Sequence, residues 1–177
     1  MSNQARNDAE LRRMFEKPLK EAVDYIVQKI WNENKELVRQ IVYEAYLPQN
    51  YNRTGQFQKA WDFDVESSAD DEKIAQGAFY YNPNTMSRGS TDPQSSDFGQ
   101  HISIIDGADM RPYLADIIYN GAYGRAWMNG AGKRDAWDAL INSVGKQKMK
   151  QWLKEGMQKA GLQGTLHTTP IEVKYSK

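Results

Sequence analysis

The chain contains no cysteine among its 177 residues. A disulfide framework, a thiolate metal site and a cysteine nucleophile are therefore excluded. Histidine is almost as scarce, because only His101 and His167 occur. Neither histidine has a metal-ligand spacing to the other or to a pair of carboxylates, so we interpret both as ordinary polar side chains. The sequence predicts no metal site, no cofactor and no catalytic residue.

Long apolar runs are also missing, because no stretch approaches the roughly 20 residues that a membrane-spanning helix needs. Residues 1–13 are polar and charged, which is not the pattern of a secretory signal. We therefore expect a soluble protein without membrane contact, and the lack of cysteine fits a reducing cytoplasm. The length suggests a single domain over 1–177, with an arm or short helix at 1–17 and an extended tail at 162–177.

Net charge is absent overall, since 23 basic side chains balance 23 acidic ones. The balance hides an asymmetry along the chain. Residues 47–130 carry six basic and eleven acidic side chains, which gives −5, whereas residues 131–177 carry nine and four, which gives +5. Regions of opposite charge can attract each other within a subunit or between neighbouring subunits.

Apolar residues recur at steps of three and four over 7–46, which predicts an amphipathic helix. Pro18 interrupts this pattern. Because proline is well tolerated at a first helical position, we predict a break or kink near Lys17 and then one long helix over 18–46. Gly55 follows in a polar turn where a positive φ is expected.

Residues 61–66 alternate between apolar and acidic side chains, which predicts a strand with one buried face. Residues 74–81 form a second strand candidate, and the two read as a hairpin. Residues 82–99 are polar and aperiodic, which predicts a long loop, and loops of this length are usually functional or disordered.

The second half continues the mixture of strands and helices. Residues 101–105 are a short strand candidate, followed by a turn at Asp106 and Gly107. Residues 113–119 are apolar and β-branched, which favours a strand, with a short helix as the alternative. The remaining expectations are a glycine-rich loop at 120–132, an amphipathic helix at 136–160 with Gly161 as its cap, and an extended tail at 165–175. The fold class is therefore α+β: a long N-terminal helix, a small, mainly antiparallel sheet with long loops, and a C-terminal amphipathic helix.

Two sequence patterns could indicate a binding site. Asp62, Asp64 and Glu66 share one strand face and could bind a divalent cation, but nothing supplies a ligand loop, so we favour the solvated face of an edge strand. The segment 130–133 suggests a phosphate loop. The motif fails because Trp127 stands at the required glycine and an arginine follows the lysine.

The C-terminal helix is rich in lysine, which is compatible with contact to DNA or with a solvated helix face near the C-terminal dipole. These lysines are Lys146, Lys148, Lys150, Lys154 and Lys159. Three tryptophans are predicted to lie in the core rather than at an interface, namely Trp127, Trp137 and Trp152. Arg53 is predicted either to organise its turn or contact a neighbour, or to be a solvated turn residue.

The order of these segments resembles that of the tail-completion and head–tail joining proteins of long-tailed bacteriophages and prophages. The likeness spans roughly residues 15–160. Three short motifs carry it: Tyr51, Arg53, Thr54 and Gly55 after the long helix; Leu114, Ala115, Ile117, Ile118, Tyr119 and Gly121 in the apolar segment; and Arg134, Asp135 and Trp137 at the start of the last helix.

This resemblance implies a non-enzymatic subunit that forms a homohexameric ring in the virion, after assembly in the host cytoplasm. The implied partners are further copies of the chain, the head-side connector or portal, the tail tube or tail terminator, and possible packaged DNA in the lumen. Candidate contacts between subunits or with these partners are Arg53, Thr54, Gly55, Arg134, Asp135, Lys150 and Lys154.

Two other hypotheses stay open. The first is a minor capsid or tail-tube-associated structural protein, which differs from a neck ring in its copy number. The second, on weaker grounds, is a metal-dependent nuclease that uses Asp62, Asp64 or Glu66, with Lys150 and Lys154 contacting DNA.

Overall fold

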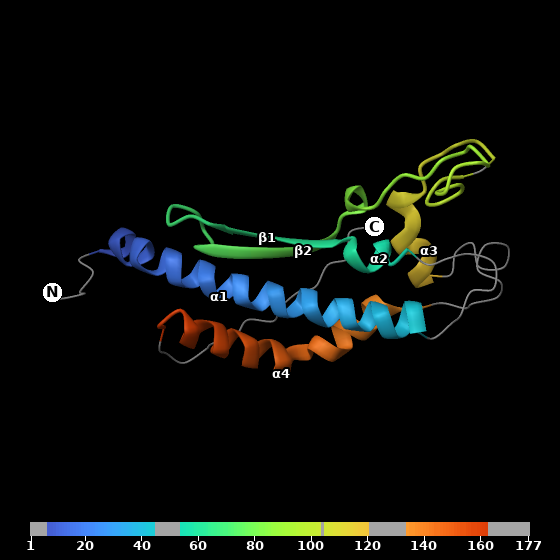
Figure 1. Cartoon of the computed structure of the whole chain (residues 1–177). Coiled ribbons are helices and arrows are strands. Elements are labelled where there is room, and N and C mark those ends of the chain that lie inside the picture. The colour runs from blue at the N-terminus through green and yellow to red at the C-terminus, as the bar shows by residue number, and fades with distance from the viewer. Residues whose placement is uncertain (1–6, 45–53, 104, 121–133, 163–177) are drawn as a thin grey trace. The chain divides into compact units, whose positions relative to one another are not determined.

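A computed structural model describes residues 7–44, 54–103, 105–120 and 134–162. The fold is α+β, as predicted (Figure 1). Its elements in chain order are α1 (Asp8–Leu37), η1 (Val38–Glu44), α2 (Gln56–Lys59), β1 (Trp61–Ser67), β2 (Ala75–Tyr81), η2 (Pro83–Thr85), η3 (Arg111–Tyr113), α3 (Leu114–Asn120) and α4 (Ala136–Lys159).

The predicted hairpin is confirmed, because β1 and β2 pair in one two-stranded sheet. The pairing is antiparallel: the Ser68 amide donates to the Ile74 carbonyl at 3.0 Å, and the Asn82 amide donates to the Ala60 carbonyl at 2.8 Å. Trp61 is buried while Asp64 is exposed, as the alternation of side chains along a strand requires.

Of the predicted break or kink near Lys17, the break is wrong, because α1 continues through Pro18 to Leu37. A proline inside a helix leaves the carbonyl four residues earlier, here that of Met14, without its usual amide donor. The helix continues on both sides of Pro18, so α1 tolerates the loss of this one bond. The part of the predicted arm that is described, from Asp8 onward, therefore belongs to α1.

The long helix widens after Leu37 into η1, a π-helical segment in which hydrogen bonds join residues five apart. An ion pair between Arg39 and Glu44 follows the same five-residue spacing. Such segments are rare and frequently mark functional positions. The sequence pattern indicated only a continuous helix here.

Two strand predictions in the second half are wrong. The described residues of 101–105 lie in no strand, and Ile102 pairs with Asp109 in an isolated bridge around the predicted turn at Gly107, whose φ is +71°. Residues 114–120 form the short helix α3, which was the alternative. The 3₁₀ turn η3 begins at Arg111, and proline is suited to the first positions of a helix.

The C-terminal helix α4 is confirmed over Ala136–Lys159, with a kink at Gly145, whose φ is +40° and ψ is 172°. Gly161 caps the helix with a φ of +75°. The Leu162 amide donates to the Met157 carbonyl at 2.8 Å, and the Gly161 amide donates to the Gln158 carbonyl at 3.1 Å. These two bonds define a Schellman cap, so the predicted C-cap is confirmed.

The chain divides into two compact units. The first unit comprises residues 1–30, 63–78 and 142–177, and the second comprises residues 31–62 and 79–141. In the first unit, Gly77 brings the hairpin close to α1, since a β-carbon there would lie 2.7 Å from a Val27 methyl. Gly156 likewise brings α4 onto α1, beside Ala22.

The second unit is organised around an aromatic cluster. Trp61 stacks on Phe79, Tyr119 and Trp137, with ring centroids 5.4, 6.0 and 5.8 Å away. Phe57 meets Trp61 edge-on at 6.1 Å. Trp137 is partly buried and packs against this cluster, whereas Trp152 in the first unit is buried, with 7% of its surface exposed, as predicted for a core residue. Trp127 lies outside the described residues, as do 121–132 and 165–175.

In the described part of the chain, every helix falls short of the length and apolar character that crossing a bilayer requires.

Candidate docking surface

The predicted contact residues fall in three places. Arg53, like Tyr51, lies outside the described residues. Gly55 has a φ of +70°, which confirms the expected turn, and it directly precedes α2. The Thr54 hydroxyl accepts a bond from the Gln56 amide at 3.4 Å. Thr54 and Gly55 therefore shape the start of α2, and their contact with a neighbouring subunit stays a prediction.

Arg134 is buried, with 7% of its surface exposed. Its Nη1 donates to the Val42 carbonyl in η1 at 3.2 Å, and its amide donates to the Ile118 carbonyl in α3 at 3.1 Å. The guanidinium therefore donates to a carbonyl in the last turn of η1, where carbonyl groups commonly need a donor from outside the helix. Asp135 accepts from the Asp138 amide at 2.8 Å and so caps α4.

The acidic row of β1 does not assemble a metal site. The Asp62 carboxylate accepts a hydrogen bond from the side-chain amide of Asn82 at 3.4 Å. The Glu66 carboxylate accepts one from the side-chain amide of Gln76 at 3.1 Å. Among the described residues, no group of three or more histidine, aspartate or glutamate side chains converges on one point. Lys150 and Lys154 are exposed on α4, where contact with DNA or a neighbour stays a prediction.

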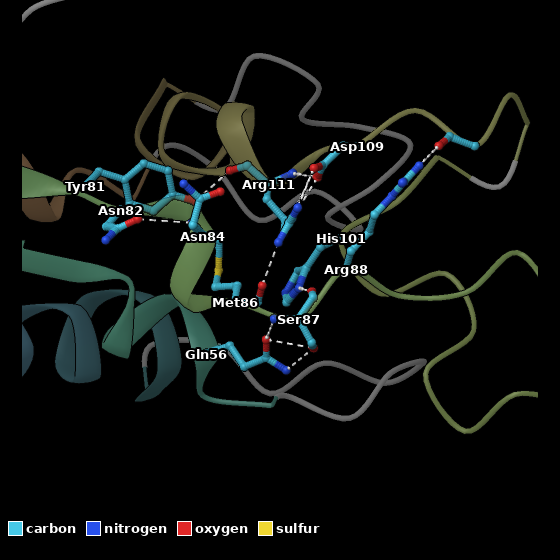
Figure 2. A network of polar contacts seen from close by, with 11 residues as sticks. Gln56, Tyr81, Asn82, Asn84, Met86, Ser87, Arg88, His101, Asp109 and Arg111 are labelled. Carbon is cyan, nitrogen blue, oxygen red and sulfur yellow. Dashed lines mark hydrogen bonds and ion pairs between the residues drawn. The ribbon is translucent and has the colours of Figure 1, made fainter.

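The structure draws attention instead to the segment 82–113, whose polar side chains form a connected network (Figure 2). Arg111 stands at its centre. Its Nη1 donates to the Met86 carbonyl at 2.8 Å, and its Nη2 and Nε donate to Asp109 at 2.7 and 3.0–3.1 Å. Tyr81 at the end of β2 donates its hydroxyl to the Arg111 carbonyl at 2.7 Å. The network therefore fastens the segment to the hairpin.

A second part of the network ties the segment to α2. Gln56 accepts from the Ser87 amide at 2.7 Å and donates to the Ser87 hydroxyl at 2.9 Å. The ring of His101 lies 3.0 Å from the Ser87 carbonyl, and its backbone has a φ of +52°. Such a φ is uncommon for a residue other than glycine, so the surrounding bonds must hold His101 in place.

The Asp109 carboxyl is more acidic than an ordinary aspartate because of its contact with Arg111. Hydrogen bonds from Arg111 lower the pKa of this carboxyl to about 2. Burial raises the pKa of the Tyr81 hydroxyl well above its usual value, so the tyrosine stays protonated and able to donate. At neutral pH the network therefore consists of a carboxylate, a guanidinium and a neutral phenol.

This ordered segment presents apolar side chains to solvent. Phe98 is 42% exposed, Tyr113 is 57% exposed, and Ile105 is 94% exposed beside the turn at Gly107. In Figure 1 the segment lies to one side of α2 and α3. A loop that holds its backbone with side-chain bonds while exposing large apolar groups is suited to binding another protein surface.

Sequence reasoning identified the loop but not the residues that organise it. Arg111 was not singled out, because its partners Met86 and Tyr81 lie 25 and 30 residues away in the chain, and without Arg111 nothing drew attention to Asp109. The only local signal was the close spacing of an aspartate and an arginine directly before a proline.

The pKa of Asp109 leads to a testable pH dependence. A carboxyl whose pKa is lowered in the folded state stabilises that state above its unfolded pKa, near 4, and this stabilisation is lost as pH falls toward 2. We expect the amide signals of residues beside Asp109 to shift with a midpoint near pH 2 in an NMR titration. The Asp109→Asn variant should lose this transition, while an unchanged titration in that variant would contradict the assignment.

Gly89 offers a second test of the ordered segment. A β-carbon at this position would lie 2.1 Å from the Gln100 carbonyl oxygen and 2.6 Å from that of Asp97, both backbone atoms that cannot swing aside. Gly89→Ala should therefore open the loop, with faster amide hydrogen exchange over residues 87–101. Ser96→Ala, at an exposed position in the same loop, is the matched control and should leave exchange unchanged.

Comparisons with protein-family models, with curated proteins and with solved structures found no match to this chain.

Proposed function

We propose that this chain is a structural subunit of the neck or tail of a long-tailed bacteriophage. Copies of it form a ring that completes the tail or joins it to the head connector. The observation that carries the proposal is the order of the segments, with their three short motifs, because it resembles that of tail-completion and head–tail joining proteins. The function needs docking surfaces rather than a reaction site.

The polar network and the exposed apolar side chains of the segment 82–113 support this proposal. The side chains of Arg111, Asp109 and Tyr81 hold its backbone in place. The side chains of Phe98, Ile105 and Tyr113 are exposed. Apolar side chains on an ordered loop favour binding, because little conformational entropy remains to be lost on contact. In the proposed ring these side chains bind a neighbouring copy or the adjoining layer of the virion.

The charge distribution also supports association between copies. Residues 47–130 sum to −5 and residues 131–177 to +5, so these two regions can attract each other between neighbouring subunits. A contact between different surfaces of identical chains is head-to-tail, and such contacts close into rings when the rotation allows. Association through such a contact should weaken as salt is raised.

The proposal is tested on virions of the phage or prophage that encodes the chain. Antibody labelling with negative-stain electron microscopy should place the protein at the junction of head and tail. Label along the whole tail or over the capsid would instead support the tail-tube or minor-capsid alternatives. Absence of the protein from purified virions would exclude all three structural roles.

A further inference from the structure

The first turns of α1 carry an apolar stripe that the described structure leaves open. Leu11, Met14 and Phe15 are 42%, 40% and 38% exposed. Their spacing of three and four places them on one side of the helix. An amphipathic helix normally buries such a stripe, so this exposed face is a candidate contact surface.

The hairpin does not compete for this stripe, because it is held by polar residues of the same turns. Arg12 donates through Nη1 to the Asp71 carbonyl at 2.8 Å, and the Ser67 hydroxyl donates to Glu16 at 3.3 Å. Within the described part of the first unit, α1 therefore turns a polar side to the hairpin tip and an apolar side to solvent.

Charges beside the stripe specify what fits on it. Glu10 and Lys17 are seven residues apart, two helical turns, so they lie on the same flank. When two such helices run antiparallel about a two-fold axis at Met14, each Glu10 faces the Lys17 of the other copy. Parallel pairing would place like charges together, and antiparallel pairing also aligns the helix dipoles favourably.

The Lys17 side chain is able to make this contact. It is 87% exposed and lies 4.0 Å from Glu21 in its own helix, a weak solvent-exposed pair. Residues 8–18 carry three acidic and three basic side chains, so two copies of the segment meet without net repulsion. The stripe and its flanking charges are thus complementary to themselves.

We propose that the Leu11, Met14 and Phe15 face of α1 pairs antiparallel with the same face of a second copy. This contact is two-fold, so it goes beyond the head-to-tail ring and does not rest on it. Stable interfaces bury roughly 1,600 Å² in total, and two pairs of short helical turns bury less. The contact is therefore weak and depends on protein concentration.

A cysteine-free chain allows a clean cross-linking test, because one substitution introduces a single thiol. In Met14→Cys the two thiols meet at the two-fold axis, so mild oxidation should give a disulfide-linked dimer on a non-reducing gel. Arg13→Cys places an exposed thiol on another side of α1 and is the matched control. Equal dimer yields for the two variants would overturn the proposal.

Charge reversal tests the pairing by a second route. Lys17→Glu and Glu10→Lys, each alone, place like charges opposite each other, and each should weaken dimerisation in sedimentation equilibrium by about tenfold. The double variant Glu10→Lys with Lys17→Glu should restore it. Failure of the double variant to restore the dimer would overturn antiparallel pairing.

A third experiment tests whether another part of the same chain covers the stripe. If residues 163–177 cover the stripe in place of a second copy, deleting them will raise the Met14→Cys dimer yield, and the charge variants will have no effect on the full chain. That outcome also overturns the proposal. None of these results bears on the location of the protein in virions, so the proposed function is judged separately.

Discussion

Trp61→Ala should lower the free energy of unfolding of the second unit by about 3–5 kcal/mol, which is the range for removing a large buried aromatic side chain. Trp61 is 3% exposed, and the centroids of five other aromatic rings lie within 6.1 Å of its own, those of Phe57, Phe79, Tyr81, Tyr119 and Trp137. Trp61 is the ring that the other aromatic rings contact in common. Its removal leaves a space that the neighbouring side chains cannot refill. Natural domains have only about 5–15 kcal/mol of stability, so this loss is a large fraction.

Urea unfolding followed by far-ultraviolet circular dichroism measures this effect without depending on tryptophan fluorescence. Tyr113→Ala is the control, because this tyrosine is 57% exposed and its loss should change stability by less than about 0.5 kcal/mol. A Trp61→Ala protein within about 1 kcal/mol of the original would show that the aromatic cluster does not hold the second unit together.

Gly156→Val should destabilise the first unit by about 2–3 kcal/mol through overpacking. A β-carbon at Gly156 would lie 2.8 Å from the Ala22 carbonyl oxygen and 3.3 Å from its α-carbon. Both are backbone atoms of α1, so α4 would have to move away. That movement would also strain the bond from the Tyr25 hydroxyl to Glu155, which measures 2.8 Å.

Gln158→Val is the matched control for this prediction. It lies on the same helix at an exposed position, and it introduces the same β-branched side chain with its modest cost in helix propensity. The difference between the two variants in urea unfolding isolates the packing effect. Equal losses would indicate that α1 and α4 do not rely on close approach at Gly156.

The parts of the fold that were predictable have strong local signals. The alternation of Trp61, Asp62, Phe63 and Asp64 specifies a strand with two different faces, and β1 follows it. Gly161 after an amphipathic run specifies a helix cap, and the Schellman bonds are present. In these segments, local preference and tertiary packing favour the same structure.

The wrong predictions arose where packing overrides local preference. Ile117 and Ile118 favour a strand by propensity, yet both are buried in α3, a helix of seven residues that is too short to show a clear helical period. Pro18 suggested a boundary, but the tertiary contacts on both sides of it keep α1 continuous. A single sequence does not reveal these contacts.

The candidate site shows the same division. The length and polarity of residues 82–99 predicted a long loop, of a kind that is usually functional or disordered, and part of that loop exposes Phe98. Its organising bonds from Arg111 to Met86 and from Tyr81 to Arg111 could not be predicted, because they join residues far apart in the chain. The resemblance predicted Arg134 as a contact residue. It did not predict that Arg134 is buried and donates to the Val42 carbonyl in η1.

The most direct test of the central claim is a count of this protein in purified virions by quantitative mass spectrometry, against the capsid protein as the internal standard. A closed neck ring predicts about six or about twelve copies in each particle. Absence of the protein from virions, or an abundance like that of a tail-tube protein, would contradict a role in the neck.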